Sequence, residues 1–132
     1  MIYLLIYIRY DHVADEWTFM PNMITGKSLH GSVGVKNKLF VFDYEFSEVF
    51  DSTSGKFVAL KKKPSHFKFG KVSFKYCMLQ TFVAGNKLVT LGSYSSIALC
   101  YDVEKNEWSE EPSEATKNMN EFSCALLPKM KF

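Results

Sequence analysis

The chain has 132 residues, of which 47% are hydrophobic and 16% aromatic, and its formal net charge at pH 7 is +2. Four prolines and seven glycines are too few for a disordered chain, so the composition favours a globular protein. The apolar segment 1–8 is too short to cross a bilayer, which needs about 20 residues. No basic residue precedes it and no small-residue cleavage site follows it, so we predict a buried strand within residues 1–10 and no membrane partner.

One spacing occurs three times along the chain. An aromatic residue and an Asp are followed, six positions after the Asp, by a second aromatic residue. The Asp residues lie 40 and 51 positions apart, and the closing aromatics repeat both intervals. This period is typical of repeat proteins and suits a four-stranded propeller blade. The residues of the three copies are Tyr10, Asp11, Trp17, Phe50, Asp51, Phe57, Tyr101, Asp102 and Trp108.

Each copy predicts two strands joined by a tight turn. The first aromatic would end one strand, and the second would lie early in the next. The Asp can accept hydrogen bonds from amides two or three residues on, which begins a turn. Four residues after each Asp stand Asp15, Gly55 and Asn106, which tolerate the left-handed backbone that such a loop requires. We expect the aromatics to fill the layers between blades, in a structural rather than catalytic role.

Further elements follow the same phase. Segments 37–42 and 86–91 each predict a turn that leads into a buried strand, and segment 122–127 predicts the first strand of a further blade. Prolines after each closing aromatic would end strand pairing, and they are Pro21, Pro64 and Pro112. The methionines of segment 20–23 are expected to fill gaps in the packing.

Together these features resemble the kelch repeat. The resemblance rests on the Tyr-Asp…Trp unit, on the apolar strands at 39–42 and 88–91, and on the Met-Pro-Asn-Met segment at 20–23. The segment Lys-Ser-Leu-His-Gly at 27–31 is similar to the basic-x-x-His segment of the family. The double glycine of the family is replaced by Asp-Tyr at 43–44 and Gly-Ser at 92–93, which suggests altered turns on one face.

The resemblance implies an all-β fold of kelch-type β-propeller blades, each a four-stranded antiparallel sheet. About three blades fit into 132 residues, whereas closed propellers typically carry about 4–8. We therefore expect residues 1–132 to form a single partial kelch propeller, an incomplete piece of a larger one, with approximate repeats 1–36, 37–85 and 86–132. Unpaired faces at its two ends would favour self-association.

Charge is unevenly distributed. Residues 52–101 carry eight lysines and no acid, and they contain an insertion, since Phe57 to Leu88 spans 31 positions but Trp17 to Leu39 only 22. An insertion in a repeat protein maps to a loop, often on the binding face. We expect this loop to contact an acidic protein partner; a loop kept for solubility is the alternative, and nucleic-acid stacking the least favoured one. Its candidate binding residues are Lys61, Lys62, Lys63, His66, Lys68 and Lys71.

No pattern in the sequence predicts catalysis, a metal or a cofactor. The cysteines lack Cys-x-x-Cys spacing, and we expect them to be inert thiols on strands in a reducing compartment. They are Cys77, Cys100 and Cys124. The acidic residues Asp43, Glu45 and Glu48 are interpreted as a solvated face.

The resemblance to kelch-like proteins implies a non-enzymatic, cytoplasmic protein-binding module. Many of these proteins join a propeller to a cullin-binding BTB domain, which makes the chain a candidate substrate-recognition part of a ubiquitin ligase adaptor. Other kelch proteins bind actin, so an actin-binding cytoskeletal scaffold is the alternative. The partner would be a ubiquitination target in the first case and actin in the second.

Overall fold

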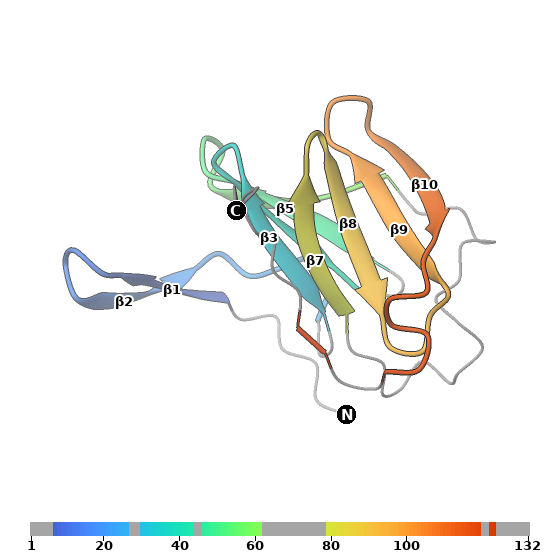
Figure 1. Ribbon diagram of the computed structural model, residues 1–132. Coiled ribbons are helices and arrows are strands. Elements are labelled where there is room, and N and C mark those ends of the chain that lie inside the picture. The colour runs from blue at the N-terminus through green and yellow to red at the C-terminus, as the bar shows by residue number, and fades with distance from the viewer. Residues whose placement is uncertain (1–6, 27–29, 44–45, 62–78, 120–121, 124–132) are drawn as a thin grey trace, which may run out of the picture.

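The computed structural model describes residues 7–26, 30–43, 46–61, 79–119 and 122–123. In this part of the chain the protein consists of ten β-strands and contains no helix (Figure 1). Every strand pair is antiparallel. The prediction of an all-β fold is therefore confirmed.

The strands form three sheets. The first is a hairpin of β1 (Tyr7–Asp11) and β2 (Glu16–Met20). The second contains β3 (Gly31–Val35), β4 (Lys38–Phe42), β5 (Ser47–Asp51) and β6 (Lys56–Ala59). The third contains β7 (Leu79–Ala84), β8 (Lys87–Gly92), β9 (Ile97–Asp102) and β10 (Glu107–Pro112). Both four-stranded sheets are meanders, because each strand pairs with its neighbours in sequence.

The main core lies between the two four-stranded sheets. Phe40 and Phe42 of β4 pack against Leu88 of β8 and Tyr101 of β9. The expected buried strands at 37–42 and 86–91 are thus confirmed as β4 and β8, each of which follows a tight turn. Alternation along β4 explains this packing, since residues two apart in a strand point to the same face.

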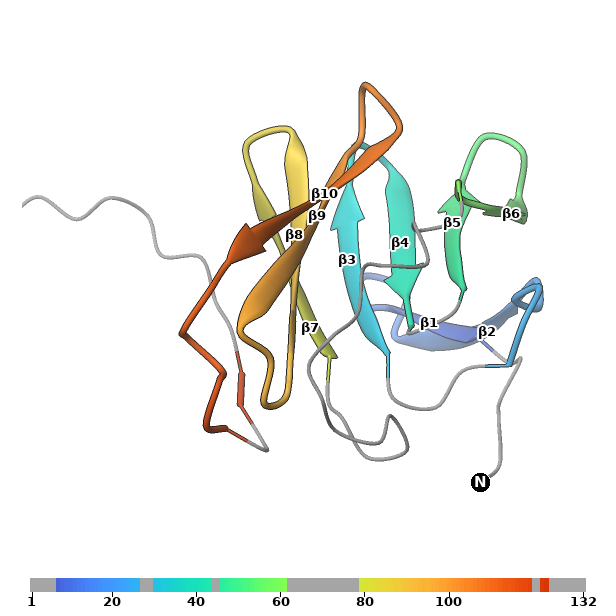
Figure 2. The same ribbon diagram turned by 90° about the vertical axis from the view of Figure 1, so that its right-hand side faces the viewer.

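The first strands of the two meanders, β3 and β7, lie side by side (Figure 2). A Cβ atom on Gly31 of β3 would collide with the side chain of Thr81 on β7. The absence of a side chain at position 31 therefore permits this close approach. Thr81 in turn shares a hydrogen bond with Thr90 of β8, with their hydroxyl oxygens 2.9 Å apart.

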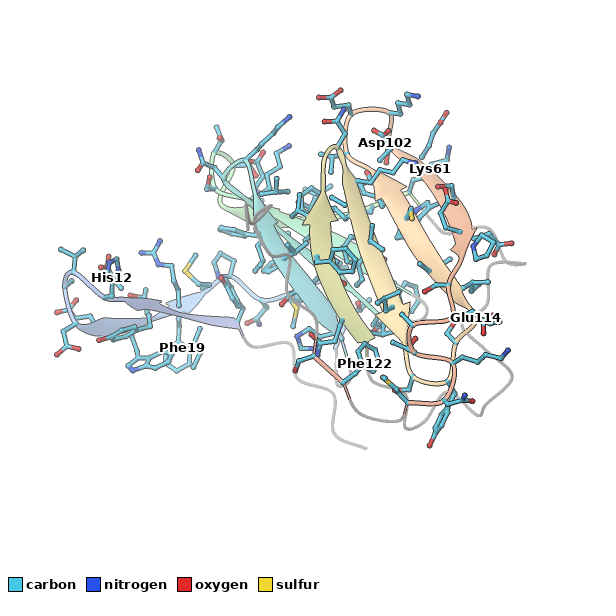
Figure 3. The ribbon with its side chains drawn as sticks, in the orientation of Figure 1. His12, Phe19, Lys61, Asp102, Glu114 and Phe122 are labelled. Atoms are coloured by element: carbon cyan, nitrogen blue, oxygen red, sulfur yellow. The ribbon has the colours of Figure 1, made fainter. Side chains whose placement is uncertain are left out.

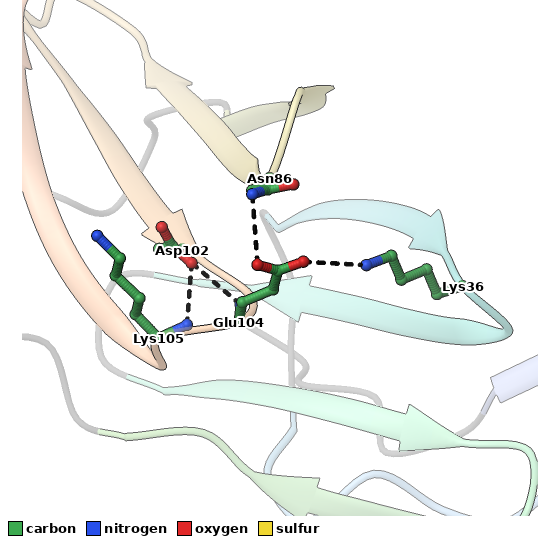
Figure 4. Close-up of polar contacts among 5 residues, drawn as sticks. All are labelled: Lys36, Asn86, Asp102, Glu104 and Lys105. Carbon is green, nitrogen blue, oxygen red and sulfur yellow. Dashed lines mark hydrogen bonds and ion pairs between the residues drawn. The ribbon is translucent and has the colours of Figure 1, made fainter.

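A polar bridge joins the turns at one end of the two sheets (Figure 4). The carboxylate of Glu104, in the β9–β10 turn, accepts a hydrogen bond from the side-chain amide of Asn86 in the β7–β8 turn, at 3.4 Å. Its other oxygen lies 3.5 Å from the ammonium nitrogen of Lys36, in the β3–β4 turn. Both side chains of the Lys36–Glu104 pair are exposed. We therefore expect the pair to align the turns but to add little to the stability of the fold.

The β1–β2 hairpin projects from the body of the molecule and touches it at one end (Figure 1). The ring of Tyr7 meets Phe57 edge to face, with centroids 5.9 Å apart, and lies 6.3 Å from Phe50. Met23, which follows the hairpin, is buried with Val41 and Phe57. The expected gap-filling role is therefore confirmed for Met23.

Two expected boundaries agree with the structure. Strand β2 ends one residue before Pro21, and β10 ends at Pro112; Pro64 lies outside the described residues. The strand expected within residues 1–10 is described from Tyr7 onwards, where it forms β1. In the segment 122–127, only residues 122 and 123 are described, and neither belongs to a strand.

Candidate protein-binding surface

The recurring sequence interval corresponds to a recurring hairpin. In each copy the two aromatic residues are direct cross-strand partners, and their ring centroids lie 5.0, 5.2 and 5.0 Å apart. Cross-strand aromatic pairs of this kind stabilise a hairpin. The pairs are Tyr10 with Trp17, Phe50 with Phe57, and Tyr101 with Trp108.

The turns have the expected chemistry. Asp11 accepts hydrogen bonds from the amides of residues 13 and 14, Asp102 from those of residues 104 and 105, and Asp51 from that of residue 53. These amides lower the pKa of Asp11 and of Asp102, because they stabilise the charged carboxylate. The predicted left-handed positions are also confirmed, with φ of 56°, 69° and 54° at Asp15, Gly55 and Asn106.

A hydrogen bond within the hairpin explains which residue stands at each left-handed position. The hydroxyl of Tyr101 donates to the side-chain oxygen of Asn106 at 2.6 Å, and that of Tyr10 donates to Asp15 at 2.5 Å. In the middle copy Phe50 has no hydroxyl, and Gly55 offers no side-chain acceptor. The hydrogen bond to Asp15 raises the pKa of Tyr10, whereas burial raises the pKa of Tyr101.

The three aromatic pairs differ in what they pack against. Tyr101 is buried, and the ring of Trp108 meets Phe42 of the neighbouring sheet edge to face, with centroids 5.7 Å apart. Phe57 is also buried. The prediction of burial is wrong for the first copy, in which Tyr10 and Trp17 are 45% and 69% exposed. The reason is that no described residue covers this side of the hairpin.

The exposed pair belongs to a continuous apolar face of the β1–β2 hairpin. Ile8 pairs with Phe19, next to the pair formed by Tyr10 and Trp17, and alternation places all four side chains on the same side. Ile8 is 48% exposed and Phe19 is 80% exposed. Figure 3 shows Phe19 on the hairpin, away from the two larger sheets. We call these four residues the hairpin face; apolar patches of this kind mark interaction sites.

The lysine-rich loop lies almost entirely outside the described residues. Lys61 is exposed (Figure 3). Its backbone carbonyl accepts a hydrogen bond from the indole of Trp108 at 2.8 Å. The other candidate binding residues, Lys62, Lys63, His66, Lys68 and Lys71, are not among the described ones. The role of this loop in binding an acidic partner stays a prediction.

Glu48 is buried, so its interpretation as part of a solvated face is wrong. Its carboxylate accepts hydrogen bonds from the amide of Ile24 at 2.9 Å and from the amide and hydroxyl of Thr25 at 2.8 and 2.5 Å. These bonds hold the segment after β2 onto the second sheet. The sequence held a signal for this, since Glu48 lies two positions before Phe50 in β5 and therefore shares its inward face.

The other two acids of that group differ from Glu48. The carboxylate of Asp43 accepts a hydrogen bond from the amide of Phe46 at 2.9 Å, within a turn. Glu45 lies outside the described residues.

The described residues contain no cluster suited to metal chemistry. No three His, Cys, Asp or Glu side chains among them are grouped to hold an ion. Cys100 is buried on β9, as expected of an inert thiol, and burial raises its pKa. Cys77 and Cys124 lie outside the described residues. No helix that could span a membrane occurs in the described part of the chain.

Neither the models of known protein families nor the curated proteins match this sequence.

Proposed function

We propose that the chain is a non-enzymatic protein-binding module built of kelch-type propeller blades, and that the hairpin face is one of its contact surfaces. The exposure of Trp17 and Phe19, which are 69% and 80% exposed, carries this proposal. Large aromatic side chains are expensive to leave in water and are enriched at protein interfaces. A surface that presents four apolar side chains together favours a protein partner over a small molecule.

The arrangement of sheets supports blades. Two meanders stack with their first strands side by side, and the aromatic pair of each one faces the preceding unit. Tyr101 and Trp108 pack on the β3–β6 sheet, and Phe50 and Phe57 pack towards Tyr7 of the hairpin. If the aromatic pair of the hairpin is covered in the same way, one more β-sheet would pack against the hairpin face. In the isolated chain, we propose that a second copy supplies this cover.

Self-association of the whole chain tests the hairpin face. We expect sedimentation velocity at micromolar concentration to show an associated species, which becomes a monomer when Trp17→Ser and Phe19→Ser are combined. Val13→Ser is the control, because Val13 is an apolar residue of the same hairpin that is at least as exposed as Trp17 and Phe19 but lies in the turn. A wild-type monomer, or association that is unchanged in the double variant, would contradict the proposal.

Within this class we propose the substrate-recognition part of an adaptor for a cullin-based ubiquitin ligase, in the cytoplasm, with a ubiquitination target as partner. The resemblance to kelch-like proteins supports this choice. The gene sequence upstream of the codon for Met1 tests it, since a reading frame that continues into a BTB domain would support the adaptor. A frame with kelch repeats alone, together with co-sedimentation of the protein with actin filaments, would instead support the cytoskeletal scaffold.

A further inference from the structure

A groove lies on the opposite side of the β1–β2 hairpin from the hairpin face. It has a volume of about 440 Å³ and separates the hairpin from the β3–β4 turn and the end of β5. Its apolar lining includes Tyr7 and Met20 from the hairpin, and Leu39 and Phe50 from the second sheet. Because Tyr7 pairs with Met20 and alternates with Ile8, the groove and the hairpin face use different side chains of the same two strands.

The groove has a positively charged rim. Arg9 of β1, Lys36 of the β3–β4 turn and Lys38 of β4 all line it and are all exposed. None of its described lining residues is acidic. Lys36 pairs with Glu104, but neither Arg9 nor Lys38 forms an ion pair within the described residues. An anionic group in the groove would therefore meet Lys38, which forms no ion pair with a described residue, and Arg9, whose charge also acts on the carboxylate of Asp11 further along β1.

The β3–β4 turn, which carries Lys36 and immediately precedes Lys38, is a tight two-residue turn. Lys36 and Asn37 both have left-handed backbone angles, with φ of 49° and 60°, as a two-residue hairpin turn of this hand requires. The hydroxyl of Ser52, which also lines the groove, donates to the backbone carbonyl of Asn37 at 2.9 Å. The backbone at this part of the rim is therefore ordered before a ligand binds, which limits the backbone entropy lost on binding.

We propose that this groove binds an extended acidic peptide segment of a partner protein. An apolar side chain of the segment occupies the space between Tyr7 and Leu39, and flanking carboxylates face Arg9 and Lys38. An extended segment suits the site because the groove runs between the β1–β2 hairpin on one side and the β3–β4 turn on the other.

The same surface is poorly suited to a nucleic acid. Base stacking needs a free ring face, but the rings of Tyr7 and Phe50 already pack against each other and against Phe57. The three cations of the rim also fall short of the several phosphate contacts on which such binding depends.

The probe is a fluorescently labelled six-residue peptide with the sequence Glu-Glu-Leu-Phe-Glu-Glu. The receptor is the whole chain. We expect fluorescence anisotropy to show saturable binding that weakens as salt rises from about 50 to about 300 mM, because screening shortens the reach of exposed charges. Charge reversal at both Arg9→Glu and Lys38→Glu should weaken binding about tenfold. NMR shift changes should include the amides of Arg9 and Lys38.

Lys105→Glu combined with Lys117→Glu is the matched control, because it makes a similar charge change at two exposed lysines that do not line the groove. The proposal is overturned if both double variants weaken binding equally, since the effect would then reflect net charge. It is also overturned if an oligothymidylate of equal charge binds more tightly than the peptide. Circular dichroism of each variant confirms that the β-fold is retained.

The test is independent of the hairpin face. Trp17→Ser with Phe19→Ser should leave peptide binding unchanged, because neither side chain lines the groove. Loss of peptide binding in that variant would mean that the groove does not form the site by itself, and it would overturn the proposal.

Discussion

The indole N–H of Trp108 donates a hydrogen bond to the backbone carbonyl of Lys61, at 2.8 Å. Trp108 lies in β10, the last strand of the third sheet, whereas Lys61 follows the last strand of the second sheet. The bond therefore joins the outer parts of two sheets whose first strands are already in contact. It also fixes the point at which the lysine-rich loop leaves the second sheet.

Trp108→Ala should lower the free energy of unfolding by about 2–4 kcal/mol, because the ring is half-buried against Tyr101 and Phe42. Trp108→Phe keeps an aromatic ring but leaves the carbonyl without its donor, and should cost about 1 kcal/mol. Urea denaturation measures both. Trp17→Ala is the control, with an expected cost below about 1 kcal/mol at a protein concentration where the chain is monomeric. Equal costs at positions 17 and 108 would contradict the difference in burial.

Glu48→Gln should destabilise the fold by about 1–3 kcal/mol, because a buried carboxylate that accepts three hydrogen bonds is replaced by an amide with only one acceptor oxygen. Its NH₂ group would also face the donors of Ile24 and Thr25. Thermal unfolding of the two proteins measures the loss. Glu107→Gln makes the same chemical change at an exposed position of β10 and should be nearly neutral. A neutral Glu48→Gln would show that the carboxylate is not needed to hold residues 24 and 25.

The bond between Tyr101 and Asn106 is suited to a double-mutant cycle. Tyr101→Phe and Asn106→Gly should each cost about 0.5–1.5 kcal/mol, since both remove the bond while glycine keeps the left-handed backbone. The double variant recreates the Phe and Gly combination found at positions 50 and 55. It should cost less than the sum of the two single changes. Strict additivity in chemical denaturation would show that the hydroxyl and the amide do not interact.

The stability of the fold should depend on pH through Asp102. Its folded-state pKa is lowered, chiefly by the hydrogen bond from the amide of Lys105, so the unfolded chain binds the proton more readily. The contribution is therefore present above the ordinary aspartate pKa and is lost as pH falls through the folded-state value. We expect the urea midpoint to fall below about pH 4, and Asp102→Asn to make that fall shallower. An unchanged acid profile in the variant would contradict this assignment.

The structure of the turns could be predicted from the sequence wherever a single residue type determines the backbone conformation. The Asp residues, the left-handed positions and the cross-strand aromatics all belong to turns of a few residues, and all three turns have the expected form. Burial was harder to predict, because it depends on a second surface. Trp17 and Trp108 occupy the same place in their hairpins, but only Trp108 has a neighbouring sheet to pack on.

Glu48 shows the opposite error. Its charge suggested exposure, whereas its place in the alternation of β5 required burial, and the donors that make burial tolerable come from residues 24 positions or so before it. The groove could not be predicted for a similar reason. Arg9 and Lys38 are 29 positions apart in sequence, and their shared rim depends on how the hairpin docks onto the second sheet.

The single-ended attachment of the β1–β2 hairpin has a consequence for the order in which the protein opens. A two-stranded hairpin is marginally stable alone, and this one is held mainly through Tyr7 and through Met23 behind it. Its amide hydrogens should therefore exchange with solvent well before those of β4 or β8, through an opening that leaves both larger sheets intact. Any partner that covers the hairpin would slow this exchange, so that recognition and completion of folding would become one thermodynamic event.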